Sequence, residues 1–261
     1  MPFIESGSIK YFRCASLEQE GLYHAFFTRH GGISPVPWHS LNFGASVGDE
    51  IQRVRQNRDI ALDCINLKPE SVYDVYQIHS VEVVCTDRPL SASETHLKAD
   101  AIITNHPGVT LLMRFADCVP ILLFDPVKRT VAIVHAGWVG TVGRILQKTI
   151  LALVHNYKSN PRDIIAAIGP SIGPDHYSVG EDVIKQVYAS FNAMSDQVIR
   201  KENESYYLDL WKANQIILCE MGITKIEVVG ICTNCNLNDW YSHRGEKRTT
   251  GRFGVVIGLS N

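Results

Sequence analysis

"VPILLFDPVKRTVAIVHAGW", residues 119–138, decides the fold because it holds two apolar runs, a turn and a glycine-rich end. Residues 119–125 and 130–136 are rich in aliphatic and β-branched side chains, which favour β-strands. The polar and turn-forming residues "DPVKRT" separate the two runs. The stretch therefore predicts a β-hairpin whose second strand ends at a histidine.

The turn fixes which residues of this hairpin face one another. A two- or four-residue loop centred on Val127 and Lys128 makes the paired positions sum to 255. Cys118 then lies opposite Gly137, and His135 is its diagonal neighbour on the same face, about 7–8 Å away at Cα. The sequence thus predicts that a cysteine and a histidine side chain can reach each other.

A neighbouring cysteine and histidine allow three interpretations. They can be a nucleophile with its base, two ligands of a soft metal ion, or a buried thiol beside a hydrogen-bonded histidine. His79, in "VYQIHS", also ends an apolar run and is a candidate third partner, and the loop histidines His30, His39 and His243 are possible as well. A catalytic zinc ion keeps three protein ligands from nitrogen and sulfur donors, and His79, Cys118 and His135 would supply that set.

Strand-like and helical patterns alternate along the rest of the chain. Strands are expected over 22–28, 72–80, 81–87, 109–115, 164–168, 225–232 and 253–259. Helices are expected over 49–64, 181–192 and 209–221, and after "GWVG", where the apolar residues at helical spacing are Val142, Ile145, Leu146, Ile150, Leu153 and Val154. The pattern predicts one α/β or α+β domain over residues 1–261, with a sheet that is at least partly antiparallel.

Composition narrows the class of protein. The chain has 261 residues, of which 45% are hydrophobic and 20% charged, and this balance is typical of a globular protein. A net charge of −2 gives no electrostatic reason to expect nucleic acid or an anionic membrane as a partner. With neither a signal peptide nor an apolar run of roughly 18 residues, a cytoplasmic location is expected.

Seven cysteines in such a chain are expected to be free thiols. Four lie in apolar or helical contexts and are predicted to be small core residues: Cys14, Cys64, Cys85 and Cys219. Cys232 and Cys235 form "CTNC", and a lone C-x-x-C is weak evidence for a metal, so we interpret them as free thiols as well.

Several motifs occur together and in a familiar order. They are "FFTRHGGIS", "SLNFG", "VRQNR", "QIHS", "ADAIIT", "ADCVPILLFDP", "HAGWVGT", "IGPSIGPDHYSVG", "LDL" and "CTNC…YSHRGEKRTTGR". In this order they resemble the laccase-like purine nucleoside phosphorylase family, formerly labelled multicopper polyphenol oxidase. The resemblance covers nearly the whole chain, and "ADCVP" followed by "HAGW" is its most specific part.

The resemblance implies a single domain of layered α/β/β/α type with mixed sheets, similar to cysteine hydrolases. It implies a zinc centre formed by His79, Cys118 and His135, the same set that the strand ends favour. The implied reactions are phosphorolysis of adenosine, inosine, guanosine or methylthioadenosine, and hydrolytic deamination of adenosine. Purine nucleosides and phosphate would be the partners, and the oligomeric state stays open, a monomer included.

Both reactions make physical sense at such a site. Zinc lowers the pKa of bound water, which suits attack on C6 of a purine. Phosphorolysis needs cationic groups that hold phosphate, and the arginines in the matching motifs are Arg29, Arg58, Arg244 and Arg252. Each could equally form a structural ion pair. Asn42 could bind a ribose hydroxyl, although a loop asparagine usually caps its own backbone.

The chain departs from the family pattern, and different functions compete. Val139 stands where the family usually has arginine, and Ser80 where glycine is common. Copper-dependent phenol oxidation is disfavoured, because laccase-type sites need paired H-x-H histidines and the chain has none. A hydrolase with Cys118 as nucleophile and His135 as base, acting on cell-wall precursors, is a competing function. A non-enzymatic role as a partner protein is another.

Overall fold

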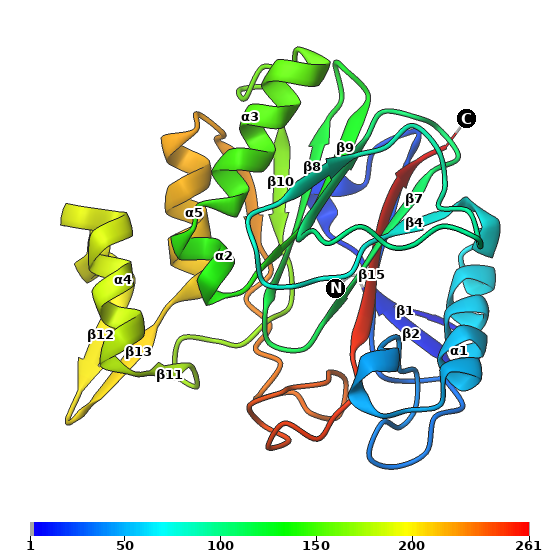
Figure 1. Ribbon diagram of the computed structural model, residues 1–261, viewed down its shortest axis with the longest axis horizontal. Helices are drawn as coiled ribbons and strands as arrows, with labels where there is room; N and C mark the ends of the chain where they lie inside the picture. The colour runs from blue at the N-terminus through cyan, green and yellow to red at the C-terminus, as the bar shows by residue number, and fades with distance from the viewer. Residues whose placement is uncertain (1–2, 261) are drawn as a thin grey trace.

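The computed structural model describes residues 3–260, which form two six-stranded mixed sheets packed face to face, with helices on both outer surfaces (Figure 1). The first sheet has the strand order β1-β2-β3-β15-β7-β4, and the second has the order β14-β10-β8-β9-β6-β5. Helix α1 lies outside the first sheet, and α2, α3 and α5 lie outside the second (Figure 1). This is the layered α/β/β/α architecture with mixed sheets that was expected.

The bounds of the elements are as follows. The first sheet contains β1 (Phe3–Ser6), β2 (Ile9–Phe12), β3 (Leu22–Phe27), β15 (Phe253–Leu259), β7 (Thr110–Phe115) and β4 (Val72–Asp74). The second contains β14 (Lys225–Val228), β10 (Ile165–Ile168), β8 (Val119–Asp125), β9 (Thr130–Ala136), β6 (Ala101–Thr104) and β5 (Val83–Cys85). A small third sheet contains β11 (Ser178–Val179), β13 (Ser205–Leu208) and β12 (Ile199–Glu202). The helices are α1 (Ile51–Cys64), α2 (Trp138–Val142), α3 (Ile145–Tyr157), α4 (Glu181–Phe191) and α5 (Leu210–Glu220). Within residues 3–260, no helix combines the length and apolar character that crossing a membrane requires.

The hairpin of β8 and β9 has the predicted register. Asp125 pairs with Thr130, and each further pair up to Val119 with Ala136 also sums to 255. The turn is closed by the Asp125 carboxylate, whose Oδ1 accepts backbone N–H bonds from Val127 at 2.9 Å and Lys128 at 3.0 Å. An aspartate that bonds the backbone two and three residues ahead specifies a tight turn, and this explains why local sequence is enough to set the register.

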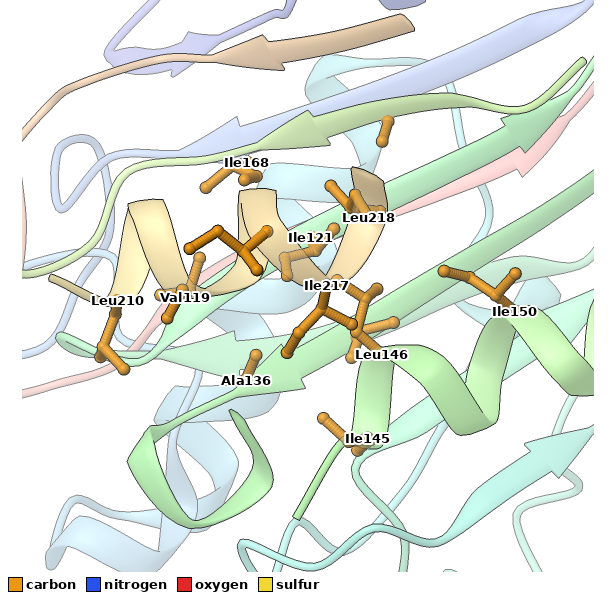
Figure 2. Packing of buried hydrophobic residues seen from close by; sticks show 14 of the residues in the cluster. Val119, Ile121, Ala136, Ile145, Leu146, Ile150, Ile168, Leu210, Ile217 and Leu218 are labelled. Atoms are coloured by element: carbon orange, nitrogen blue, oxygen red, sulfur yellow. The ribbon is translucent and has the colours of Figure 1, made fainter. Parts of the chain in front are cut away.

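Both faces of this hairpin are buried, so its strands are almost continuously apolar. Figure 2 shows Val119 and Ile121 directed towards the helices, where they pack with Leu146 of α3 and Ile217 of α5. Leu122 belongs instead to the cluster between the two sheets. Alternate residues of one strand thus support the two layers, and burying each such side chain stabilises the fold by roughly 1.5–3 kcal/mol.

Three expected elements are shorter or broken. The strands expected over 72–80 and 81–87 shrink to β4 and β5, because the chain between them turns and its amide groups bond a buried carboxylate instead of a sheet. The single helix expected after "GWVG" divides into α2 and α3 at Gly143 and Arg144, where Arg144 has φ 64. The Arg144 guanidinium bonds the hydroxyl of Ser190 at the end of α4, which ties the break to its neighbour.

The cysteine prediction is partly wrong. Cys14 is fully buried as expected, but Cys64 is half-buried, and Cys85 and Cys219 are exposed. All seven thiols are free. Strand β14 also ends at Val228 rather than at residue 232, shortly before Gly230 with φ 68.

His24, inside β3, is held in its neutral form. Its side chain is buried, and its Nε2 accepts the backbone N–H of Cys14 at 2.8 Å, so this nitrogen carries no proton. Burial, with the nearby Arg13 charge, lowers the pKa of His24 to about 3. The unfolded chain therefore binds a proton at His24 between about pH 3 and 6.5 that the folded protein does not bind.

We predict that this histidine makes the protein acid-sensitive. Its contribution is fully present above about pH 6.5 and is lost as the pH falls, so the free energy of unfolding should drop by about 3 kcal/mol between pH 6.5 and 4. His24→Gln should flatten that slope in chemical denaturation, whereas the exposed His155→Gln should keep it. An unchanged slope in His24→Gln would show that other groups cause the acid sensitivity.

Candidate metal centre and active site

The three residues expected to form a metal site meet at the open end of the hairpin. Cys118 immediately precedes β8, His135 is near the end of β9, and His79 lies in the turn between β4 and β5. Their ligand atoms all lie within 4.8 Å of one another, and Cys118 Sγ is 3.8 Å from His79 Nε2. The structure therefore brings this predicted set together, although His79 lies in a turn with φ 57 and not at a strand end.

A buried carboxylate, Asp100, orients both histidines. Its Oδ1 accepts bonds from His135 Nδ1 at 2.8 Å and from the backbone N–H of His79 at 3.1 Å. Its Oδ2 accepts the N–H of Ser80 at 2.6 Å and the Ser80 hydroxyl at 2.8 Å. Because Nδ1 of His135 donates to Asp100, its Nε2 is left to act as a ligand, an arrangement common around protein-bound metals.

The electrostatics favour a thiolate at Cys118. Burial raises the pKa of this thiol, but the neighbouring His135 and His79 outweigh burial and bring the pKa down to about 6. Burial likewise lowers the pKa of His135, and the Cys118 thiolate with Asp100 raises it to about 9. Asp100 itself has its pKa lowered to about 2 by His135 and Ser80 despite burial. Without metal, the group is an ion pair of thiolate and imidazolium.

The geometry also fits a metal ion. Tetrahedral zinc bonds of about 2.3 Å to sulfur and 2.0–2.1 Å to nitrogen place the two ligand atoms roughly 3.6 Å apart, close to the observed 3.8 Å. Gly137 keeps the space open, since a Cβ there would lie 2.8 Å from Cys118 Sγ and 3.4 Å from a carbon of His79. The three residues are therefore suited to an ion that accepts nitrogen and sulfur ligands.

A cavity of about 510 Å³ adjoins this group. Its lining residues are His79, Ala116, Asp117, Cys118, Trp138, Ile172, Tyr177, Leu210, His243, Arg244, Lys247 and Arg248. The basic residues come from the loop 243–248, which Asp117 fixes in place: its Oδ2 accepts the N–H of Arg244 at 2.6 Å and its Oδ1 accepts the Ser242 hydroxyl at 2.7 Å. One side of the cavity thus carries the candidate metal ligands and another carries positive charge.

Of the predicted phosphate and ribose ligands, only Arg244 lines this cavity. Arg29 is buried elsewhere, where its guanidinium donates to the carbonyl of Leu237 at 2.8 Å and pairs with Glu246 at 3.0 Å. Arg58 donates to the carbonyl of Phe43 at 2.9 Å. These two arginines have structural partners.

Asn42 and Arg252 also bond the protein's own backbone. Asn42 is fully buried, with its amide group donating to Asp49 at 2.9 Å and its oxygen accepting the N–H of Gly44 at 2.9 Å. Arg252 donates to the carbonyl of Gly251 at 2.8 Å. Asn42 thus caps its own loop, as loop asparagines usually do.

The residues that position the site were not predicted from the sequence. Asp100 and Asp117 are the aspartates of "ADAIIT" and "ADC", so the motifs contained them without showing what they would bond. Tyr177, Lys247 and Arg248 carried no pattern that placed them beside Cys118. Val139, the departure from the family pattern, is 36% exposed and lies outside the cavity lining.

Residues 23–260 match the family model described as multi-copper polyphenol oxidoreductase laccase. The chain belongs to this family, the laccase-like purine nucleoside phosphorylases. It is 38% identical to the purine nucleoside phosphorylase YlmD of Bacillus subtilis over 90% of this chain and 87% of that protein. The crystal structure of Bacillus licheniformis hypothetical protein YfiH is similar with a TM-score of 0.92 and 34% identity, covering 99% of both chains. The structure of YlmD from Geobacillus stearothermophilus also gives a TM-score of 0.92, at 31% identity, over 99% of this chain and 98% of that one.

Asp100→Asn should weaken the candidate metal site, because Asp100 bonds both of its histidines. The change keeps the shape but removes the charge that pairs with His135, and one amide hydrogen must face a donor. We expect the metal-free protein to lose about 3 kcal/mol of unfolding free energy in chemical denaturation. The exposed Asp87→Asn should change stability by less than about 0.5 kcal/mol. Equal effects of the two substitutions would contradict a central role for Asp100.

Proposed function

We propose that the protein is a zinc-dependent purine nucleoside phosphorylase that also deaminates adenosine. The observation that carries the proposal is a nitrogen–sulfur ligand group beside a cavity whose other side is basic. The cavity volume of about 510 Å³ falls within the range of roughly 300–1,000 Å³ usual for small-molecule sites. The names of the related proteins support the same general activity.

His79, Cys118 and His135 would hold the zinc ion. When bound, zinc supplies a Lewis acid that can lower the pKa of water or polarise a substrate group. The Cys118 thiolate is already favoured before a metal arrives, so the proton that zinc would have to displace is the one on His135 Nε2. Asp100 keeps the proton of His135 on Nδ1 and so directs Nε2 to the ion.

The basic loop would hold phosphate. Arg244, Lys247 and Arg248 line the cavity together, and the Arg244 guanidinium lies 5.2 Å from the centre of the Tyr177 ring and donates to Ser178 at 3.0 Å. In phosphorolysis a phosphate oxygen forms a bond to ribose C1′ while the bond from C1′ to the purine nitrogen breaks. Cations around the phosphate favour this displacement because they place the nucleophile and balance its charge.

One observation favours a second candidate, a cysteine hydrolase. Without metal, Cys118, His135 and Asp100 resemble a nucleophile, a base and an orienting carboxylate, with the Nδ1 to Oδ1 bond at 2.8 Å. A substrate-derived covalent adduct on Cys118 in zinc-free protein would support this function. If bound zinc protects Cys118 from alkylating reagents and turnover requires zinc, the cysteine hydrolase function is excluded.

We predict that the three ligands act as one unit. His79→Ala, Cys118→Ser and His135→Ala should each lower the zinc content by one equivalent and reduce kcat/KM for adenosine at least 100-fold, because three protein donors are required. Zinc is measured by elemental analysis, with adenine, ribose 1-phosphate and ammonia measured on the same samples. Cys219→Ser, an exposed thiol, is the control.

The same assays can reject the proposal. If zinc-loaded wild type leaves adenosine, inosine and methylthioadenosine intact, with and without phosphate, the proposed activities are absent. Ammonia release from adenosine without phosphate separates deamination from phosphorolysis, since only the second reaction consumes phosphate.

Removing one cation should affect phosphate more than the nucleoside. Arg244→Ala should raise KM for phosphate roughly tenfold, equivalent to about 1.4 kcal/mol of lost binding, with a smaller rise in KM for inosine. Arg55→Ala removes an exposed arginine of α1 and should leave both constants unchanged. A larger rise in the KM for inosine than in the KM for phosphate would place this arginine at the nucleoside instead.

A further inference from the structure

A second cluster of nitrogen and sulfur ligands lies beside the cavity. His176, Cys232 and Cys235 offer ligand atoms that all lie within 4.8 Å of one another. We propose that these three residues form a second metal site, for a thiophilic ion of the zinc class, which clamps segment 171–177 to segment 231–236. The site shares no residue with the His79–Cys118–His135 group, and the proposal does not depend on the proposed activity.

The distances within this cluster match a tetrahedral ion. The Nδ1 atom of His176 faces both sulfurs, at 3.5 Å from Cys235 Sγ and 3.9 Å from Cys232 Sγ. Zinc bonds of about 2.3 Å to sulfur and 2.0–2.1 Å to nitrogen predict roughly 3.6 Å for this separation. The observed values bracket the expected one, so little movement is needed to bind the ion.

Backbone pairing brings the two ligand segments together before any metal binds. Ser171 pairs with Cys232 as a parallel bridge, and the N–H of Thr233 donates to the carbonyl of Ser171 at 3.0 Å. Residues 173–176 form a turn that is closed by the N–H of His176, which donates to the carbonyl of Gly173 at 3.1 Å. Proline occupies the second position of this turn, which is typical of β-turns. The turn directs the imidazole back to the C-x-x-C segment.

Gly173 adds a contact that suits a thiolate ligand. Its N–H donates to Cys232 Sγ at 3.2 Å, and a hydrogen bond to sulfur favours the charged form that binds metal. A Cβ at Gly173 would lie 3.1 Å from Cys232 Cβ and 3.2 Å from its Sγ, so any larger residue would push the sulfur away.

The donor set indicates the class of ion and its coordination. Two thiolates and one imidazole select zinc and similar soft or borderline ions over magnesium and calcium, which prefer oxygen. Cys232 is buried, whereas His176 and Cys235 are exposed, so water has access to a fourth position. The C-x-x-C motif alone did not predict this ligand group, because the third ligand, His176, is distant in the sequence.

The clamp would support one wall of the cavity. Ile172 and Tyr177, at either side of the Gly173–His176 turn, both line the cavity. On the other segment, the hydroxyl of Thr233 donates to Asp117 Oδ1 at 2.7 Å, and Asp117 fixes the basic loop. A metal ion joining the two segments would therefore restrict movement of the wall that carries Tyr177.

The test counts zinc in the intact chain. Metal-stripped protein is reloaded with zinc chloride, desalted and measured by elemental analysis. We expect two equivalents in wild type, one in His79→Ala/Cys118→Ser, and one in His176→Ala/Cys235→Ser. The exposed pair His155→Ala/Cys219→Ser is the matched control and should keep two. In the His79→Ala/Cys118→Ser background, zinc should raise the Tm by a few degrees and protect Cys232 and Cys235 from alkylation.

Two results would overturn the proposal. One is a zinc content that His176→Ala/Cys235→Ser does not lower, with folding checked by circular dichroism. The other is a disulfide between Cys232 and Cys235 that persists in reductant-treated, zinc-loaded protein, seen as a mass lower by two hydrogens. Cobalt substitution gives an independent readout, because the sulfur-to-cobalt absorption left in His79→Ala/Cys118→Ser should fall by about half when Cys235→Ser removes one of two thiolates.

Discussion

The carboxylate of Asp100 is the constraint on which the site depends. It lies just before β6, has no exposed surface, and bonds both the imidazole of His135 on β9 and the amides of residues 78–80. Those amides would otherwise lack partners, and an unsatisfied buried polar group costs about 1–3 kcal/mol. The same bonds hold His79 at φ 57, a conformation that non-glycine residues adopt only when the surroundings favour it.

This dependence explains which parts could be predicted from the sequence. The hairpin register follows from the Asp125 turn and two apolar runs, all within about twenty residues, so pairing of Cys118 with His135 could be predicted. His79 was expected at a strand end, but its amide bonds Asp100 instead of a neighbouring strand, which no period-two pattern reveals. Helix α3 likewise begins just after Arg144, whose guanidinium bonds Ser190 of α4, a residue more than forty positions further along the chain.

The role of each arginine could not be predicted from its presence in a motif, because that role depends on the groups that the folded chain places around it. Arg58 and Arg114 both pair with Asp74, whose pKa is lowered to about 2 because bonds from His96 and the two arginines outweigh burial. The positive charges of Arg58 and Arg114 are therefore paired with a carboxylate inside the fold. Arg244 differs in its partners: Asp117 accepts its backbone N–H, and its exposed guanidinium donates to neutral oxygens of Ser178 and forms no ion pair within residues 3–260. The motifs contain arginines of both kinds, those in structural ion pairs and the one beside the cavity. Only the bonding partners of each arginine in the structure distinguish the two kinds.

The group that contains His135 and the group that contains His176 differ in burial and in hydrogen bonding, and these differences favour different roles. His135 is buried and its second nitrogen bonds a carboxylate, which fixes the tautomer and strengthens it as a donor. Among residues 3–260, no carboxylate hydrogen-bonds His176, and two of its group's three residues are exposed. A metal held by the first group would lie beside the cavity, with one of its ligands oriented by Asp100. A metal held by the second would cross-link two segments that already pair, so its effect would be rigidity.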